Sequence, residues 1–280
     1  MTDAICLGIF GWPVAHSKSP QMHESAARAL GIELRYERFE VAPGDLADSI
    51  RRKHDAAIDG YNLTVPHKEA VMTLIDEVTP AAQAIGAVNT VVRTDGRYVG
   101  HNTDAPGLVR SLEEAGVQVG GARVVVLGAG GAARAAVVGL SNAGAEAITV
   151  LSRRPEQSEG LSSGLRPHVE CSLAAASLDE ASSYFETAAL LVQATSATLE
   201  SNPGALEFAA SLPFDALPDD AAVIDMVYKP LKTSVLARAE DRGLTIVDGL
   251  GMLLHQGAIA FEMWTGLEPP LDVMRSALND

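Results

Sequence analysis

Two hydrophobic periods alternate along the chain. Short apolar runs typical of β-strands are followed by segments whose apolar residues recur every three or four positions, as on one helix face. The strands predicted in this way cover residues 5–10, 34–41, 57–65, 87–93, 97–101, 123–127, 147–151, 188–193, 221–226 and 244–247. The predicted helices cover residues 20–30, 45–53, 66–78, 106–115, 131–143, 233–242, 250–264 and 271–278. This alternation predicts an α/β fold with parallel sheets.

Local signals refine this pattern. Asp95-Gly96, between two strand-like runs, is typical of a tight β-hairpin. The nearly continuous apolar run at residues 123–127 (RVVVL) is expected in a parallel sheet covered on both faces. Ser19 and Pro66 suggest helix starts, Ser19 as an N-cap and Pro66 as the first helical residue. Residues 157–183, rich in Ser, Ala and Gly, show no clear period.

Composition and charge exclude several classes of protein. Of 280 residues, 47% are hydrophobic and 20% charged, which excludes general disorder. The formal net charge of −15 argues against a nucleic-acid binder or a protein of anionic membrane surfaces. Two cysteines and scattered histidines give no disulfide framework and no metal site. With no signal peptide and no apolar run long enough to span a membrane, we expect a cytoplasmic protein. The sequence leaves open whether it is a monomer or a homodimer.

A glycine-rich segment, Gly128–Ala133 (GAGGAA), directly follows the apolar strand 123–127. It fits G-x-G-x-x-A between a strand and a helix, the context that makes this pattern specific for a dinucleotide. Gly128 allows a sharp turn, Gly130 allows close approach of a pyrophosphate, and Ala133 allows helix and strand to pack closely. The start of the helix offers free N–H groups to the phosphates. A tight turn without a ligand is the simpler alternative.

The end of the next predicted strand favours NADP over NAD. An NAD-binding protein usually has an acidic residue about 20 positions after the glycines, to bind the ribose 2′-hydroxyl. Here the position holds Ser152, Arg153 and Arg154. An arginine can bind a 2′-phosphate, which an acidic residue would repel. The alternative for the arginine pair is a solvated strand end.

Three polar segments precede the glycine loop. Ser17 and Ser19 flank a predicted helix start, which suits a small carboxylate as well as simple capping. Lys68 is predicted in the first turn of the helix 66–78, where the helix dipole disfavours a cation and would favour the neutral amine used in acid–base chemistry. Asp104 either caps the following helix or lies beside Lys68, where it would favour the ammonium. The sequence leaves both readings open.

Together these motifs resemble the shikimate/quinate dehydrogenase family, over nearly the whole chain. They comprise GWPVAHSKSPQMH (11–23), GYNLTVPHK (60–68), GAVNTV (86–91), GHNTDAPG (100–107), VLGAGGAARA (126–135), DMVYKPLKT (225–233) and DGLGMLLHQGAIAFEMWTG (248–266). The resemblance implies an N-terminal open α/β substrate domain, residues 1–104 completed by 250–280, and a Rossmann-type NADP-binding domain, residues 105–249. It also implies NADPH-dependent reduction of 3-dehydroshikimate.

Residue roles follow from the resemblance only where residues match. Lys68 and Asp104 would be the catalytic pair at the reacting oxygen. Substrate-binding roles fall on Ser17, Ser19, Asn62, Thr64, Asn89, Tyr228 and Gln256. Cofactor-binding roles fall on Gly128, Ala129, Gly130, Gly131, Ala132, Ser152, Arg153, Arg154, Thr195, Met226 and Gly249. No metal is implied.

The chain departs from the family pattern in four places. Glu24 stands where Asn is usual, Ser152-Arg153-Arg154 replaces NRT with Gln157 at a position that is commonly basic, Gln193 begins a segment that is usually NATS, and Thr198-Leu199 replaces Gly-Met. Three of these lie in the predicted nucleotide domain, so they bear on the cofactor more than on the carbonyl chemistry. A quinate dehydrogenase or dual-specificity enzyme is the nearest alternative, although serine at both 17 and 19 favours shikimate. A non-catalytic NADPH sensor is a more remote one.

Overall fold

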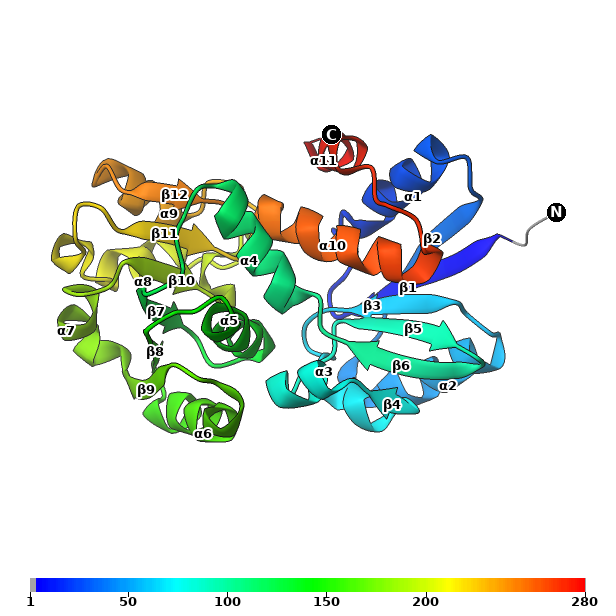
Figure 1. Cartoon of the computed structure of the whole chain (residues 1–280), viewed down its shortest axis with the longest axis horizontal. Helices are drawn as coiled ribbons and strands as arrows, with labels where there is room; N and C mark the ends of the chain where they lie inside the picture. Colours follow the sequence, from blue (N-terminus) through cyan, green and yellow to red (C-terminus); the bar gives the residue numbers. More distant parts are fainter. Residues whose placement is uncertain (1–3, 280) are drawn as a thin grey trace. The chain divides into compact units, whose positions relative to one another are not determined.

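A computed structural model describes residues 4–279, which form two compact units, each with its own six-stranded sheet (Figure 1). The first unit contains the residues up to Thr103 and those from Gln256 onward, and the second contains Asp104–His255. The division falls inside one continuous helix, α10 (Gly249–Thr265). The predicted two-domain α/β fold is confirmed.

The sheet of the first unit is mixed, whereas the sequence pattern predicted parallel pairing. Its order is β2-β1-β3-β5-β6-β4, with β5 antiparallel to both β3 and β6. The reason is the predicted hairpin, which is confirmed: Asp95 and Gly96 have φ of 51° and 79°, the left-handed values that a two-residue turn needs. The strands are β1 Ile5–Gly11, β2 Leu34–Glu40, β3 Gly60–Leu63, β4 Glu77–Val78, β5 Thr90–Thr94 and β6 Arg97–His101.

Helices cover this sheet and bury its apolar side chains. α1 packs on β2 and on α11, and one core cluster around Tyr61 and Phe10 includes residues of α2 and of the segment between β3 and β4. A second cluster, with Leu7, Ile9 and Tyr36, lies along β1 and β2. The helices are α1 Ser19–Ala29, α2 Leu46–Asp55, α3 Pro80–Ile85, α10 and α11 Leu271–Asn279.

The predicted helix at residues 66–78 is wrong. The segment forms a 3₁₀ turn at Ala70–Thr73 and then the short strand β4, which pairs with β6. Val71 is fully buried, and Leu74, Ile75 and Val78 pack against the same core, so the apolar spacing is satisfied without a helix. Here the pairing of β4 with β6 and the burial of apolar side chains determine the conformation, although the spacing of the apolar residues is helical.

The sheet of the second unit is entirely parallel, in the order β12-β11-β10-β7-β8-β9. The chain runs outward from β7 to β9, returns to β10 beside β7, and continues outward to β12. This is the doubly wound order of dinucleotide-binding folds, and its direction reverses between β7 and β10. The strands are β7 Arg123–Leu127, β8 Ala147–Ser152, β9 Ser172–Ser177, β10 Leu190–Gln193, β11 Ala222–Asp225 and β12 Thr245–Val247.

Helices of the second unit fill the connections between these strands. α5 packs on β7 and β8, and α4 packs on α5 so closely that a Cβ at Gly139 would lie 2.8 Å from the Ala105 carbonyl oxygen. The stretch 157–183, which had no clear period, provides most of α6 and all of β9. The helices are α4 Asp104–Glu114, α5 Gly131–Asn142, α6 Pro155–Leu165, α7 Ala181–Phe185, α8 Ala205–Ser211 and α9 Ser234–Asp241.

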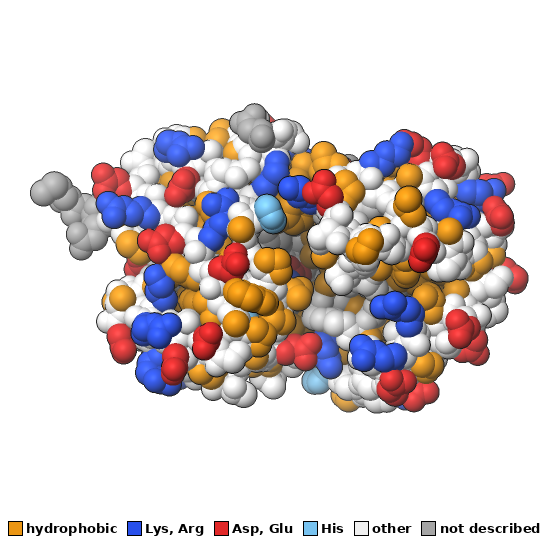
Figure 2. Space-filling model, turned by 180° about the vertical axis from the view of Figure 1, so that it is seen from behind, with side chains coloured by type: hydrophobic (Ala, Val, Ile, Leu, Met, Phe, Trp, Pro, Cys, Tyr) orange, Lys and Arg blue, Asp and Glu red, His pale blue; other side chains and the backbone are white. Residues whose placement is uncertain are grey.

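Acidic and basic side chains are interspersed on the face drawn in Figure 2, although the chain carries a net charge of −15. No described helix combines the length and the apolar character that crossing a membrane would need.

Candidate functional site

Two serines lie at the start of α1 in the first unit. The Ser17 hydroxyl donates a hydrogen bond to the Ser19 hydroxyl (3.2 Å) and accepts one from the Ser19 backbone N–H (3.3 Å). The Arg38 guanidinium donates two hydrogen bonds to the Ser17 carbonyl (3.0 and 2.6 Å). The prediction that Ser19 is the N-cap is wrong, because Lys18 holds that position and Ser19 is already helical. Paired hydroxyls at a helix N-terminus still suit a small carboxylate.

Tyr36, on β2, connects these serines to a wider polar network, although no sequence motif marks it. Its hydroxyl donates a 2.6 Å hydrogen bond to Oδ1 of Asn62, and the Ser19 side chain is a further partner. Burial raises the pKa of Tyr36, with Ser19 and then Arg38 acting weakly in the opposite direction, so the hydroxyl stays protonated. The available signal was the alternating strand pattern, which places Tyr36 on the buried face.

Asn89 is the centre of this network. The Asn62 amide donates to the Asn89 carbonyl and to the Thr90 hydroxyl, both at 3.0 Å. The Asn89 amide donates to the Thr103 hydroxyl (2.9 Å) and to Oε1 of Gln256 (3.4 Å), and its Oδ1 accepts from the Thr103 N–H (2.7 Å). Each of these side chains is more than nine-tenths buried. The structure therefore brings together Asn62, Asn89 and Gln256, which lie far apart in the sequence.

Lys68 joins the network through its backbone. Its carbonyl accepts a hydrogen bond from the N–H of Val88 (2.8 Å), the residue before Asn89. Thr64 lies in the same segment, where its carbonyl accepts from the N–H of His67 (2.9 Å). Because the segment is not a helix, the argument that a helix dipole opposes the Lys68 cation no longer applies. The half-buried Lys68 is instead placed by a turn at the edge of buried polar groups.

Asp104 is the first residue of α4 and of the second unit. It directly follows Thr103, whose N–H and hydroxyl are both held by Asn89, so the covalent chain fixes where the Asp104 backbone starts. The residue is only 5% exposed and lies in the first helical turn, where the dipole favours an anion. Hydrogen bonds thus tie Lys68 to Val88 through the backbone and Asn89 to Thr103 through the Asn89 side chain, up to the residue before Asp104.

The glycine loop of the second unit fits a dinucleotide. Gly128 has a φ of 111°, which disfavours other residues, and its N–H donates to the Leu151 carbonyl (2.8 Å). Gly130 is the N-cap of α5, and a Cβ built there meets no atom within 4 Å. No side chain caps α5, so the N–H groups of Gly131 and Ala132 have no intrahelical acceptor. Open space over free N–H groups is the arrangement that a pyrophosphate needs.

Thr195 forms the opposite side of this loop. A Cβ on Gly128 would lie 2.7 Å from the Thr195 methyl group, so Thr195 lies directly against the glycine. Gly128 follows β7 and Thr195 follows β10, the two strands between which the sheet reverses direction. In open α/β sheets, ligands bind outside the carboxyl ends of the strands at this point. The structure therefore brings the predicted Gly128 and Thr195 together there.

The predicted 2′-phosphate segment lies at the end of β8. The Ser152 hydroxyl is buried and donates to the carbonyl of Arg154 (2.6 Å), so it shapes the turn. Arg153 and Arg154 are both exposed, and Arg154 is the N-cap of α6. Two exposed cations at the start of a helix suit the 2′-phosphate of NADP better than the neutral ribose 2′-hydroxyl of NAD.

Met226, Tyr228 and Gly249 lie after β11 and at the start of α10. The Met226 N–H donates to the Gln193 carbonyl (3.0 Å), and a Cβ on Gly249 would lie 2.8 Å from the Met226 carbonyl oxygen. Only glycine allows these two segments to approach so closely. Tyr228 is half-buried and belongs to the second unit, whereas the other predicted substrate residues belong to the first.

Asp225, which no motif singled out as a site residue, supports this segment. Its carboxylate is fully buried and accepts hydrogen bonds from the Thr233 hydroxyl (2.7 Å) and the Val227 N–H (2.9 Å). Burial raises the pKa of Asp225 to about 6, and the hydrogen bonds from Thr233, Val227 and Thr198 limit the rise.

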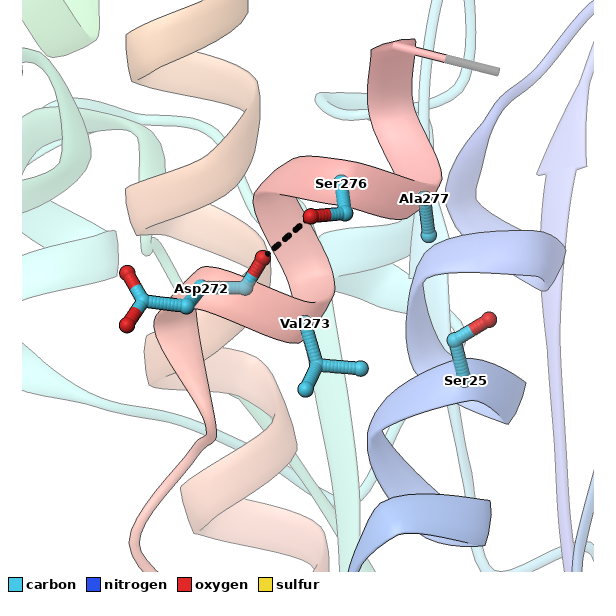
Figure 3. Close-up of a pocket in the computed structure, with 5 residues that line it drawn as sticks. All are labelled: Ser25, Asp272, Val273, Ser276 and Ala277. Carbon is cyan, nitrogen blue, oxygen red and sulfur yellow. Dashed lines mark hydrogen bonds between the residues drawn. The ribbon is translucent and has the colours of Figure 1, made fainter.

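A shallow hollow between α1 and α11 is lined by Ser25, Asp272, Val273, Ser276 and Ala277 (Figure 3). The Ser276 hydroxyl donates to the Asp272 carbonyl within α11 (2.9 Å), and no predicted site residue lines the hollow. Within residues 4–279, no group of three His, Cys, Asp or Glu side chains is arranged to hold a metal ion.

Comparisons with known proteins agree along the chain. Residues 9–91 match the model of the shikimate dehydrogenase substrate binding domain, residues 111–201 that of shikimate / quinate 5-dehydrogenase, and residues 249–278 that of the shikimate 5′-dehydrogenase C-terminal domain. The shikimate dehydrogenase (NADP(+)) of Symbiobacterium thermophilum is 43% identical over 277 residues, covering 97% of this chain and 92% of that protein.

Solved structures show the same likeness. The shikimate 5-dehydrogenase of Thermus thermophilus, in complex with NADP(H) and shikimate, superposes with a TM-score of 0.85 and 40% identity over 98% of each chain. Quinate dehydrogenase from Corynebacterium glutamicum, in complex with NAD, gives a TM-score of 0.88 and 32% identity over 98% of each chain.

Proposed function

The chain belongs to the shikimate dehydrogenase family, and on that premise we propose that it catalyses the reversible NADPH-dependent reduction of 3-dehydroshikimate to shikimate. It is an oxidoreductase with NADP as cofactor, acting in the pathway to chorismate and the aromatic amino acids. The observation that carries the proposal is the buried network in which Asn89 joins Asn62, Thr103 and Gln256 beside the backbone of Lys68. An array of amides and hydroxyls suits a small polyol.

The first unit binds the substrate in this proposal. Ser17 and Ser19 hold its carboxylate at the start of α1, while Thr64, Asn89 and Gln256 bind ring hydroxyls. Both N–H groups of Asn62 are engaged within the protein, so Asn62 contributes through the remaining lone pair of Oδ1, as an acceptor. Tyr228, in the second unit, completes the carboxylate subsite.

The second unit holds the cofactor. Gly128, Ala129, Gly130, Gly131 and Ala132 would hold its pyrophosphate. Arg153 and Arg154, on the turn that Ser152 shapes, would hold its 2′-phosphate. Met226 and Gly249 would lie near the nicotinamide, and Thr195 would be a further cofactor contact. When bound, NADPH supplies the hydride for the carbonyl carbon. The protein's task is to hold the acceptor carbonyl in register, which contributes a large share of the rate enhancement.

Lys68 acts as the acid. Its ammonium Nζ–H donates a proton to the oxygen of the carbonyl as that oxygen becomes an alkoxide, and in the reverse direction the neutral amine accepts the proton. The Asp104 carboxylate accepts hydrogen bonds from Lys68 and from the neighbouring substrate hydroxyl, and thereby orients both. General acid help of this kind is typically worth about 10²- to 10⁴-fold in rate.

The roles are tested by Lys68→Met and Asp104→Asn. NADPH oxidation with 3-dehydroshikimate, and NADP⁺ reduction with shikimate, are followed by absorbance at the nicotinamide band. We expect kcat of Lys68→Met to fall at least 100-fold, while shikimate binding measured by calorimetry changes little. Lys232→Met, which removes an exposed lysine paired with Glu240, serves as the matched control and keeps wild-type kcat. Near-normal kcat in Lys68→Met would refute the assigned role.

Quinate is the second candidate substrate, because a quinate dehydrogenase of the same fold is 32% identical to the chain. Quinate differs by an extra hydroxyl at C1, next to the carboxylate that Ser17 and Ser19 bind. We expect kcat/KM to be higher for shikimate than for quinate. A higher kcat/KM for quinate would reverse the assignment. Turnover of neither substrate, with NADPH still bound, would indicate a sensor rather than an enzyme.

A further inference from the structure

The cofactor half of the site depends on a buried side chain with no assigned role. Resting on NADP binding by the second unit, we propose that Gln193 is a positioning residue, whose side-chain amide holds Thr195 against the glycine loop and thereby sets the affinity for NADP.

The Gln193 side chain makes three hydrogen bonds, two of them to the backbone of Thr195. Its Nε2 donates to the Thr195 carbonyl (3.0 Å) and to the Thr198 hydroxyl (3.0 Å), and its Oε1 accepts from the Thr195 N–H (2.9 Å). The side chain is fully buried. One amide therefore fixes both backbone polar groups of Thr195, which is a two-point restraint on its position and orientation.

Thr195 has little room to move toward the glycine loop. A Cβ on Gly128 would lie 2.7 Å from the Thr195 methyl carbon and 3.2 Å from the Ala194 carbonyl oxygen. The space between the loop and Thr195 thus depends on the lack of a Cβ at Gly128 and on the hydrogen bonds from Gln193 to Thr195. A shift of Thr195 by a fraction of an ångström changes the width of the crevice at the reversal point of the sheet.

Gln193 also joins the next strand to this arrangement. Its backbone carbonyl accepts from the Met226 N–H (3.0 Å), and Thr198, bonded by its side chain, is in turn a hydrogen-bond partner of the Asp225 carboxylate. A single residue at the end of β10 therefore links the segments that follow β7, β10 and β11. Thr195 and Met226, both proposed to contact the cofactor, are thus both hydrogen-bonded to Gln193.

The test is the affinity for NADP⁺, measured by calorimetry on the whole protein without substrate. Gln193→Met has nearly the same shape but none of the three hydrogen bonds, and we expect its Kd to rise roughly tenfold, the equivalent of about one net hydrogen bond. Gln193→Asn keeps an amide that is one methylene shorter, and its Kd should lie between those of the wild type and Gln193→Met. Thr198→Val removes only one of the three hydrogen bonds of Gln193, together with the bond from Thr198 to Asp225, and should raise the Kd by about two- to threefold.

Ser141→Ala is the matched control. Ser141 is buried at the far end of α5, where its hydroxyl accepts from the N–H groups of Glu170 (3.1 Å) and Cys171 (3.5 Å). Because Ser141→Ala also removes buried hydrogen bonds, we expect it to lower the melting temperature, as Gln193→Met should, but to leave the Kd unchanged. This separates positioning of the cofactor from general stability of the unit.

Two results would overturn the proposal: a wild-type Kd in Gln193→Met, or an equal rise of Kd in Ser141→Ala. If Gln193→Met does not fold, the other proteins provide the test. The Kd should then increase from wild type to Thr198→Val to Gln193→Asn, and equal Kd values for the three would overturn the proposal. Failure of the wild-type protein itself to bind NADP⁺ would refute the proposed function instead.

Discussion

His23 provides the most direct test of the energetics in the first unit. It is fully buried in α1, stacked on Tyr36 (4.9 Å between ring centroids) and edge-on to Trp264 (5.2 Å). Within the described part of the chain, neither ring nitrogen has a hydrogen-bond partner. Burial lowers the pKa of His23 from 6.5 to about 3, so the native state holds the imidazole neutral.

The consequence is a stability that falls in mild acid. Between pH 3 and 6.5 the unfolded chain binds a proton at His23 that the native state does not, so each pH unit below 6.5 costs about 1.4 kcal/mol of unfolding free energy. From pH 7.5 to pH 5 the loss is about 2 kcal/mol. His23→Leu removes this linkage. At pH 7.5 it also removes a buried N–H without an acceptor, worth about 1–3 kcal/mol, against about 0.5–1.5 kcal/mol of lost aromatic stacking.

Urea unfolding followed by tryptophan fluorescence measures the stability of the first unit, which contains His23. Both tryptophans of the chain, Trp12 and Trp264, belong to the first unit, and Trp264 contacts His23 itself. The free energy of unfolding is compared between variant and wild type at each pH. The double difference is the value for pH 5 minus the value for pH 7.5. His54 and His101, whose pKa values are also lowered by burial, contribute equally to both proteins and cancel.

We expect this double difference to be about 2 kcal/mol in favour of His23→Leu. His168→Leu, at an exposed position of the second unit, should give a value near zero. A double difference below about 0.5 kcal/mol for His23→Leu would show that the imidazole is protonated in the native state, and the burial argument would fail.

Three further predictions concern one residue of the first unit and two of the second. Tyr36→Phe removes the hydroxyl that donates to Asn62, so KM for shikimate should rise about tenfold with a smaller change in kcat, measured by steady-state kinetics. Arg153→Ser should weaken NADPH binding about tenfold while leaving NADH binding unchanged, as fluorescence titration would show; equal losses for both would contradict contact with the 2′-phosphate. Asp225→Asn should abolish a fall in stability of about 2 kcal/mol that titration of Asp225 gives the wild type as pH rises from 3.8 to 6, because the native state holds the Asp225 proton more tightly than the unfolded chain; far-UV circular dichroism in urea would detect it.

The sequence predicted best where one local rule acts without competition. The strand at Arg123–Leu127 matches its prediction residue by residue, because a parallel strand covered on both faces reads as an uninterrupted apolar run. The Asp95-Gly96 hairpin is equally local, since its turn needs left-handed backbone that these residue types tolerate. The glycine loop combines both signals, a buried strand and a turn that only glycine permits.

Prediction failed where partners distant in sequence decide the structure. The residues at 66–78 have helical spacing, but pairing of β4 with β6 and burial of Val71 satisfy the same side chains in another conformation. The β9 strand has mostly Ala and Ser, which carry little strand signal, and it forms because it lies beside β8. Neither partner is visible to a local pattern.

The same distinction separates the site residues that motifs identify from those that they miss. Lys68, Asn89 and the glycines have side chains or backbone conformations that a ligand would require, so a motif marks them. Tyr36 and Gln193 act on other protein groups: one donates to Asn62, and the other holds the backbone of Thr195. Their residue types are set by the geometry of these hydrogen bonds within the protein, not by contact with a ligand. Supporting residues of this kind become recognisable only when the hydrogen bonds of the folded chain are known, and their effects should appear in KM and Kd before they appear in kcat.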